Sequence, residues 1–303
     1  MLLVAGDAHP ELARNIARLA GMKVVPTLVS AFADGETRIR IEADVRGSDV
    51  CVVQPTSAPT SQRLVTLALM AEAAHDAGAA RVTAVVPYFG FARQDVRHNA
   101  GEPRSAQLAA RILRCAGVER LVTLDLHSPA LESAFEMQVI QLRADDVMLP
   151  AIQRCGLSHL SIVSPDAGGV KRAQRFAAAM AAPLAVVAKI RPRADVAVTL
   201  QVLGDVRDRA CMIVDDMAST GGTIAGAAQA LLAAGAAEVH AVFVHAVMAP
   251  GALERICASS VRRIMTTDSV PVVQDPRVQV VSIAPLMAEA LSTLAAPVPM
   301  EPR

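Results

Sequence analysis

The sequence contains little that would suit a membrane, a disulfide framework or a nucleic-acid surface. Tryptophan is absent and aromatic residues make up 2% of the 303 residues, too few for a surface on which bases stack. Basic and acidic residues balance at 29 each, so the net charge attracts neither nucleic acid nor an anionic membrane. No uncharged apolar run reaches the roughly 18 to 20 residues of a membrane-spanning helix. We therefore expect a globular protein with neither kind of partner.

The cysteines are few and widely spaced. Their number, five, is odd, and no two of them form a CxxC pair, so the sequence indicates neither a disulfide framework nor a zinc site. We expect reduced, buried thiols. The N-terminus passes from a short apolar stretch to Gly6 and Asp7 without a basic segment, which does not indicate a secretory signal, so we expect a cytoplasmic protein.

Short apolar runs alternate with alanine-rich stretches along the chain, in which 53% of the residues are hydrophobic. The runs that we expect to form strands cover residues 2–5, 50–53, 82–86, 121–124, 160–163, 212–214 and 239–244. Continuous apolar runs separated by helices are typical of parallel strands that are buried on both faces. The sequence therefore predicts an α/β fold with parallel sheets flanked by helices.

An internal repeat predicts two similar domains. Residues 78–85, GAARVTAV, recur at 235–242 as GAAEVHAV, and each copy follows a strand, a small-residue turn and an alanine-rich helix. We expect the domain boundary near residues 141–145. The N-terminal domain would cover 1–142 and be joined by a C-terminal helix at 283–297, and the second domain would cover 143–282.

The strongest motif is MIVDDMASTGGT at residues 212–223, a buried strand that ends in Asp215 and Asp216 before a short turn opens a helix. The turn contains Ser219, Thr220, Gly221, Gly222 and Thr223. Backbone amides at such a helix start form a nest for a phosphate, and paired acids suit ribose hydroxyls or a hydrated Mg²⁺. The alternative is an ordinary turn with Thr220 as the helix N-cap, but the acid pair favours the phosphate site.

The motif is not a P-loop, because Thr223 stands where that loop needs a lysine. It resembles the phosphoribosyl diphosphate signature shared by type I phosphoribosyltransferases and ribose-phosphate pyrophosphokinases. In the first half of the chain the positions equivalent to the acid pair hold Gln54 and Pro55. That half must therefore serve another purpose.

Further motifs distinguish between the two families. They are FADGE at 32–36, VPYFGFARQD at 86–95, TLDLHS at 123–128, SPDAGGVKR at 164–172 and KIRPR at 189–193. In this order and spacing they resemble ribose-phosphate pyrophosphokinases along almost the whole chain. The resemblance implies two type I phosphoribosyltransferase-like domains and Mg²⁺-dependent transfer of the β,γ-diphosphate of ATP to the C1 hydroxyl of ribose 5-phosphate, giving phosphoribosyl diphosphate and AMP.

The resemblance also implies roles for individual residues. The ribose-5-phosphate site would contain Asp166, Asp215, Asp216, Ser219, Thr220, Gly221, Gly222 and Thr223. His127 and Asp166 would hold the metal, and Asp125, two residues before His127, would point to the same face of a strand. A loop over the triphosphate would contribute Lys189 and Arg191, which would stabilise charge on the diphosphate and on the leaving AMP.

The nucleotide would be held by two loops and by His127. Arg93 and Gln94 lie in a loop that combines an aromatic ring, a guanidinium, an amide and an acid, which could hold a purine and its phosphates or form a polar surface turn. Taken alone, the segment with Phe32, Asp34 and Glu36 predicts a tight turn before a strand at 37–41. In the family this turn is lent by a neighbouring subunit, which implies a homo-oligomer with shared active sites.

Two other functions remain open from the sequence. A nucleobase phosphoribosyltransferase would share the acid pair and the phosphate turn, but it would not need the FADGE and RQD motifs. A catalytically silent regulatory subunit of a diphosphokinase would be indicated by loss of Lys189, Arg191, His127 or the acid pair, and all of these are present.

Overall fold

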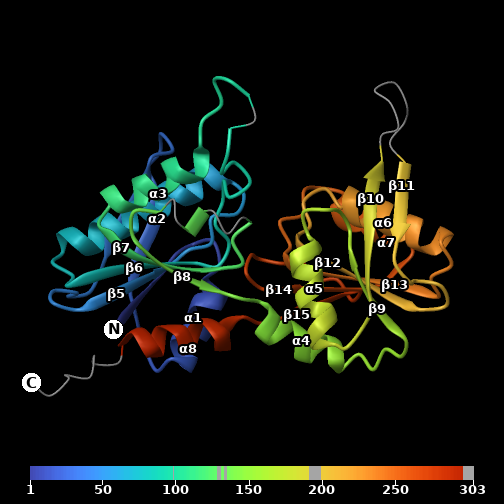
Figure 1. The fold of residues 1–303 in the computed structure, drawn as a ribbon. Helices are drawn as coiled ribbons and strands as arrows, with labels where there is room; N and C mark the ends of the chain where they lie inside the picture. Colours follow the sequence, from blue (N-terminus) through green and yellow to red (C-terminus); the bar gives the residue numbers. More distant parts are fainter. Residues whose placement is uncertain (98, 128–130, 133–134, 191–198, 296–303) are drawn as a thin grey trace, which may run out of the picture. The chain divides into compact units, whose positions relative to one another are not determined.

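The protein divides into two compact units in a computed structural model that describes residues 1–97, 99–127, 131–132, 135–190 and 199–295. Unit 1 consists of Met1–Arg143, Ser269–Pro271 and Ile283–Arg303, and unit 2 consists of Ala144–Asp268 and Val272–Ser282. Each unit is built around its own sheet (Figure 1).

The sheet of unit 1 has the strand order β2-β1-β5-β6-β7-β8, and every described pair in it is parallel. Its strands are β1 (Leu2–Ala5), β2 (Lys23–Val25), β5 (Asp49–Val53), β6 (Arg81–Val86), β7 (Val118–Leu124) and β8 (Gln138–Leu142). The central strands are buried almost throughout, as their continuous apolar runs predict.

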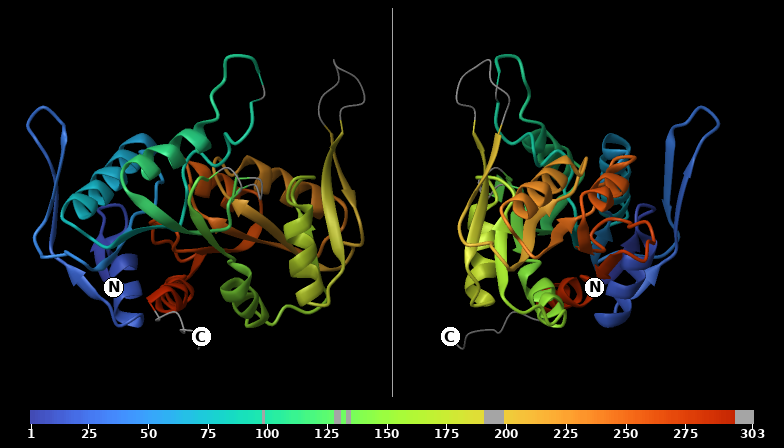
Figure 2. Two further views of the ribbon diagram at one scale, coloured as in Figure 1. Left: turned by 60° about the vertical axis from the view of Figure 1, so that its left-hand side comes forward. Right: turned by 90° about the vertical axis from the view of Figure 1, so that its right-hand side faces the viewer.

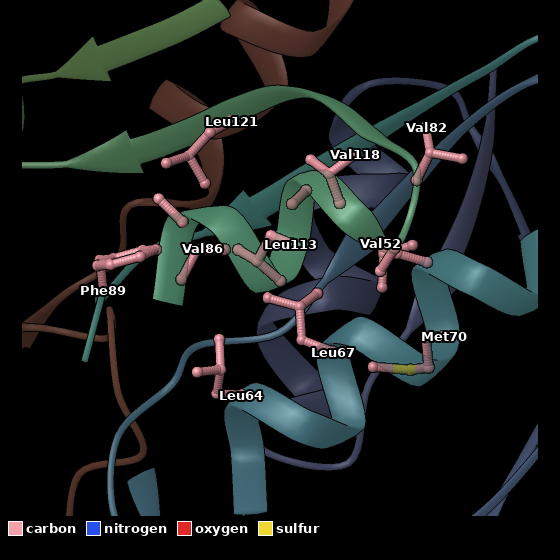
Figure 3. Close-up of a cluster of buried hydrophobic side chains, with 14 of the residues drawn as sticks. Val52, Leu64, Leu67, Met70, Val82, Val86, Phe89, Leu113, Val118 and Leu121 are labelled. Carbon is pink, nitrogen blue, oxygen red and sulfur yellow. The ribbon is translucent and has the colours of Figure 1, made fainter. Parts of the chain in front are cut away.

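Helices cover both faces of this sheet. In Figure 1, α1 (Pro10–Leu19) and α8 (Ala284–Ala295) lie on one face, and α2 (Thr60–Asp76) and α3 (Ser105–Cys115) on the other. Figure 3 shows the core beneath α2 and α3, where Leu67, Met70 and Leu113 pack against Val52 and Val86 of the strands. Burial of such side chains supplies most of the stability of a layer of this kind.

Unit 2 has the strand order β11-β10-β9-β12-β13-β14-β15. Its strands are β9 (Leu160–Ser164), β10 (Leu184–Ile190), β11 (Thr199–Leu203), β12 (Ala210–Met217), β13 (Glu238–His245), β14 (Val261–Thr267) and β15 (Val278–Val281). Its helices are α4 (Asp145–Gln153), α5 (Val170–Ala179), α6 (Gly222–Ala233) and α7 (Ala252–Ala258). The described pairs are parallel except that β11 runs antiparallel to β10 at the edge. The sequence analysis did not predict this edge strand.

The two units repeat one another, which confirms the prediction of two similar α/β domains. Gly78 and Gly235 occupy the same turn between a helix and a strand, with φ of 84° and 95°. The carbonyl of Gly78 accepts from the amide of Gly47 at 2.8 Å, and the carbonyl of Gly235 accepts from that of Asp208 at 2.8 Å. The positive φ explains the glycine at this position in both units.

A two-stranded hairpin stands apart from the sheet of unit 1. It consists of β3 (Thr27–Ala31) and β4 (Thr37–Ile41), which pair antiparallel. Figure 2 shows it as a blue arm that extends beyond the sheet of its unit. The predicted turn at residues 32–36 forms the tip of this arm.

The expectation of buried cysteines holds for Cys51 and Cys211 only. Cys115, the last residue of α3, is exposed. Cys155 and Cys257, which also lie at or near helix ends, are half-buried. All five are free thiols. Among the helices that the structure describes, none has the length and apolar character needed to cross a membrane.

Candidate active site

The acid pair lies at the carboxyl end of a central strand. The strand β12 lies between β9 and β13, and its first residues are fully buried, which fixes its position in the sheet. Asp215 is half-buried, and Asp216 is buried, with 6% of its surface exposed. The carboxyl ends of parallel strands are the usual place for ligands in open α/β sheets.

Carboxylates crowd this end of the sheet. Burial, together with the neighbouring carboxylates of Asp216 and Asp166, raises the pKa of Asp215 to about 8. The amide of Asp216 donates to Oδ1 of Asp215 at 2.8 Å, which holds the first carboxyl in place. The site is therefore electronegative and suits hydroxyl donors or a hard cation.

Asp166 follows β9, the strand next to β12. Its Oδ1 accepts from the amide of Gly169 at 3.1 Å, and its carbonyl accepts from Oγ of Ser164 at 2.7 Å. Gly169 is the N-cap residue of α5, and the Asp166 carboxyl holds its amide from three residues earlier. The carboxyl is thereby fixed at the strand end, where its charge acts on Asp215.

The turn at residues 219–223 contains a glycine that no other residue could replace without strain. Gly221 is the N-cap of α6 with φ of 75°, and a Cβ on it would lie 2.7 Å from the carbonyl oxygen of Ala252. Thr220 is therefore not the N-cap, and its Oγ1 lies 3.5 Å from the amide of Gly222. The close packing of α6 against α7 requires glycine here.

Three successive carbonyls of the turn are bonded to one neighbouring segment. The amide of Met248 donates to the carbonyl of Ala218 and that of Ala249 to the carbonyl of Ser219, both at 2.9 Å. Nη1 of Arg255 donates to the carbonyl of Thr220 at 3.1 Å. Because the C=O and N–H of a trans peptide point in opposite directions, the amides of residues 219–221 are left to face the other side. Three successive amides that face one side are suited to form a backbone nest for an anion.

The equivalent position in unit 1 is filled by that unit's own side chains. The strand registers place Gln54 where unit 2 has Asp215, as the sequence comparison predicts, and Asp7 where it has Asp166. Nε2 of Gln54 donates to Asp7 at 2.9 Å, and Nη1 of Arg63 lies 2.5 Å from the same carboxyl. Oε1 of Gln54 accepts from the amide of Ala8 at 3.0 Å. Sequence analysis missed Asp7, which only the strand registers reveal.

His127 does not lie on a strand. β7 ends at Leu124, and Asp125 has a φ of 39°, so the alternation that would place Asp125 and His127 on one face does not apply. Asp125 is buried and its amide donates to the carbonyl of Leu142 at 3.0 Å, whereas His127 is exposed. The expectation of a shared strand face was wrong, because the chain turns immediately after Leu124.

The remaining predicted residues of unit 1 are exposed. Arg93 and Gln94 lie in the loop after β6, where the amide of Gln94 donates to the carbonyl of Phe91 at 2.8 Å. At the hairpin tip, Oδ1 of Asp34 accepts from the amide of Glu36 at 3.2 Å. The guanidinium carbon of Arg38 lies 5.5 Å from the centre of the Phe32 ring, which is 50% exposed.

One of the two predicted catalytic residues, Lys189, lies near the end of β10. The backbone of Lys189 belongs to this strand and pairs with Leu200 of β11. Arg191 lies outside the described residues. Sequence analysis also missed Arg255, because nothing in the sequence distinguishes an exposed arginine on a helix until its contact with the turn is seen.

In the part of the chain that the structure describes, no three His, Cys, Asp or Glu side chains gather into a group able to hold a metal. The donor set is nevertheless suited to Mg²⁺, which binds oxygen ligands and keeps several of its waters. A cation here would use one or two carboxylates together with oxygens of water and substrate.

These observations define a class of protein. Two repeated α/β units, one of which carries an acid pair and a glycine-containing turn at the end of a central strand, form a phosphoribosyltransferase-like architecture. Residues 1–117 match the family described as the N-terminal domain of ribose phosphate pyrophosphokinase, and residues 142–280 match the phosphoribosyl transferase domain family. The chain belongs to the ribose-phosphate pyrophosphokinase family.

Individual relatives agree with this assignment. The ribose-phosphate pyrophosphokinase of Burkholderia pseudomallei is 39% identical over 299 residues, which cover 97% of this chain and 94% of that protein. The ribose-phosphate pyrophosphokinase of Marinomonas sp. is 40% identical over 297 residues, with 96% and 94% covered. The crystal structure of phosphoribosylpyrophosphate synthetase from Mycobacterium smegmatis matches with a TM-score of 0.91 and 35% identity, covering 97% of this chain and 98% of that one.

Proposed function

We propose that the protein is a ribose-phosphate diphosphokinase, which transfers the β,γ-diphosphate of ATP to the C1 hydroxyl of ribose 5-phosphate and releases AMP. The observation that carries this proposal is the acid pair Asp215 and Asp216 at the end of β12, followed directly by the anion nest of residues 219–221. Membership of the ribose-phosphate pyrophosphokinase family supports the same reaction. A cytoplasmic location is part of the proposal.

Ribose 5-phosphate would bind in unit 2. The amides and hydroxyls of residues 219–223 would bind the 5-phosphate at the start of α6, where the helix dipole also favours an anion. Asp215 and Asp216 would accept hydrogen bonds from the ribose hydroxyls. Asp166, at the end of the adjacent strand, would lie beside the C1 end of the sugar.

A magnesium ion would be held by His127 and Asp166 together with water and substrate oxygens. When bound, it would screen the negative charge of the phosphates and of the carboxylates around Asp215. The repulsion of Asp215 by the nearby carboxylates of Asp216 and Asp166 supports this proposal, because a divalent cation would relieve it.

ATP would bind to residues of unit 1 and of a second subunit. Arg93, Gln94 and His127 would contact the nucleotide from loops at the carboxyl ends of β6 and β7. Phe32, Asp34 and Glu36, at the tip of the exposed hairpin, would come from a neighbouring copy of this chain. The proposed oligomer therefore shares its active sites between subunits.

The transfer itself would need alignment and charge stabilisation rather than a covalent intermediate. The C1 hydroxyl oxygen of the sugar would attack the β-phosphorus of ATP and lose its proton to solvent, and the bond from that phosphorus to the oxygen retained by AMP would break. Lys189 and Arg191 would stabilise the negative charge that develops on the diphosphate and on AMP.

The proposed reaction is tested by incubating the protein with ATP, Mg²⁺ and ribose 5-phosphate while following nucleotides and phosphorus resonances. We expect AMP and phosphoribosyl diphosphate in equal amounts, with no free phosphate. AMP formation that does not require ribose 5-phosphate would contradict the proposal. Binding of phosphoribosyl diphosphate without any AMP formation would instead indicate a nucleobase phosphoribosyltransferase or a silent subunit.

A further inference from the structure

Arg255 is the only side chain among the three groups that hold the carbonyls of the phosphate turn. It lies on the short helix α7, and its Nη1 donates to the carbonyl oxygen of Thr220 at 3.1 Å. The other two carbonyls are held by backbone amides, which every residue type except proline could supply. The third bond therefore depends on a side chain that can donate a hydrogen bond.

The peptide between Thr220 and Gly221 links Arg255 to the proposed phosphate site. In a trans peptide the carbonyl and the following amide point in opposite directions. A guanidinium that holds the Thr220 carbonyl on one side consequently turns the Gly221 amide toward the other side, where the nest lies. The φ of 75° at Gly221 belongs to a conformation in which successive amides can converge on one anion.

The helix that carries Arg255, α7, packs closely against the turn at Gly221. Ala252 and Ile256 are 1% and 0% exposed, and Gly221 packs so closely on them that a Cβ would lie 2.9 Å from Ile256. Arg255 itself is exposed, yet its backbone is held by the buried residues on either side of it. The backbone of Arg255 therefore has a fixed position, from which the guanidinium reaches the turn.

We propose that Arg255 is a positioning residue for the ribose 5-phosphate site, which orients the Thr220–Gly221 peptide so that the Gly221 amide donates to the 5-phosphate. This inference rests on the proposed function for the identity of the ligand. A hydrogen bond from a cation also polarises the peptide, so the amide becomes a stronger donor. Neither effect requires Arg255 to touch the substrate.

The test compares Arg255→Gln and Arg255→Lys with the wild type, and uses Arg154→Gln as the control because Arg154 is an exposed arginine at the end of α4. Calorimetry would measure binding of ribose 5-phosphate and of inorganic phosphate to each protein. We expect about five- to tenfold weaker binding of both ligands to Arg255→Gln, from loss of one charge-assisted hydrogen bond near the surface. Arg255→Lys should recover part of the loss, and Arg154→Gln should match the wild type.

Two further readouts separate positioning from a general structural role. The amide resonance of Gly221 should shift when phosphate is added to the wild type, and should shift less in Arg255→Gln. In turnover, KM for ribose 5-phosphate should rise by a similar factor while KM for ATP stays unchanged. If Arg255→Gln does not fold, as judged by its melting temperature, the same comparisons are made on Arg255→Lys.

The outcomes distinguish this inference from the proposed function. Equal phosphate affinity and an equal Gly221 shift in Arg255→Gln and wild type would overturn the role of Arg255 while leaving the reaction intact. A wild-type protein that binds ribose 5-phosphate but forms no AMP would contradict the reaction alone. A wild type that binds neither phosphate ligand would overturn both.

Discussion

The negative charge of Asp215 destabilises the folded protein, although the proposed binding of ribose uses this carboxylate. Burial and the nearby carboxylates of Asp216 and Asp166 raise its pKa to about 8, whereas an unfolded chain ionises the same group near its usual value of 3.8. The folded state therefore holds a proton that the unfolded state has lost, and stability falls as pH rises from 3.8 toward 8. Proteins tolerate such a cost where an ionised group is needed for binding.

Asp215→Asn should consequently stabilise the protein without ligands. We expect a gain of about 1 to 2 kcal/mol near pH 8, because the amide removes a charge that is costly to bury. The gain should shrink near pH 4, where Asp215 is protonated in the folded state and already about half protonated in the unfolded state. Thermal or urea unfolding at the two pH values measures it. A gain that is equal at both pH values would show that the carboxyl does not titrate as described.

Gly221 is constrained by both its backbone and its neighbours. Gly221→Ala should cost about 1 to 3 kcal/mol of stability, because its φ of 75° disfavours a side chain and the new Cβ would lie 2.7 Å from the carbonyl oxygen of Ala252. The matched control is Gly222→Ala, where the nearest atom lies 3.6 Å from the added Cβ and φ is not positive. Urea unfolding of the two variants measures the difference. Equal stability of the two would contradict the packing of α7 against the turn.

At the scale of elements, the strands and the repeat were the most predictable features. Seven apolar runs each fell within a strand, because strands buried on both faces carry no polar positions that obscure the pattern. The edge strands β2, β8, β11 and β15 were not predicted, since an edge strand is partly exposed and carries a weaker apolar pattern. The interior strands β10 and β14 were not predicted either, and β14 has two exposed residues, Arg262 and Arg263, within its apolar run. Local patterning thus predicts the centre of each sheet better than its rim.

The candidate site was predictable only where the chain itself brings residues together. Asp215, Asp216 and the turn at 219–223 are adjacent in sequence, so their joint location followed from one motif. Asp7, Arg63 and Gln54 meet through strand pairing and a helix start, and no sequence spacing indicates this. Asp125 was misplaced because its φ of 39° ends the strand one residue earlier than alternation suggests.

The repeat also aligns a buried histidine in β13 with a residue of different chemistry in unit 1. The strand registers place His240 where unit 1 has Thr83, and both side chains are buried. Burial lowers the pKa of His240 below its usual value of 6.5, and Arg263 and Arg262 act in the same direction. Glu238, whose Oε1 lies 3.5 Å from Nε2, opposes the shift without reversing it.

His240→Thr should therefore flatten the loss of stability in mild acid. As pH falls below 6.5, His240 is protonated in the unfolded chain before it is protonated in the folded protein, so wild-type stability declines. We expect the variant to lose about 1 kcal/mol less than wild type between pH 7 and about pH 5. Urea unfolding across this range measures the slope. The control is His159→Asn, an exposed site with φ of 50° that asparagine tolerates, and its slope should match wild type. An unchanged slope in His240→Thr would exclude this histidine as the source.

At the scale of the whole molecule, the two units use one architecture for different ends. Unit 2 keeps an electronegative strand end beside an open nest, whereas unit 1 closes the equivalent place with the Asp7, Gln54 and Arg63 contacts. The residues that distinguish unit 1 lie elsewhere, in its loops and in its exposed hairpin. A duplicated fold can diverge in this way because function depends on the strand-end loops and stability on the core.

The exposed hairpin leads to the last prediction, which concerns the proposed sharing of active sites. Phe32→Ala would impair the site to which the hairpin is lent, and Lys189→Ala would impair the site of its own subunit, so each variant alone should be nearly inactive. When the two are mixed and allowed to exchange subunits, some sites combine an intact hairpin from one copy with an intact Lys189 from the other. Random pairing at equal amounts makes about one quarter of the sites complete.

Mixing Phe32→Ala with Lys189→Ala should therefore restore up to about a quarter of the wild-type AMP formation per site. The matched control mixes Phe32→Ala with a double variant that carries both changes, which has no intact hairpin to lend and should restore nothing. If each site instead used the hairpin of its own chain, every site in the first mixture would carry one of the two defects. Activity would then stay at the level of the separate variants, however long the subunits were allowed to exchange.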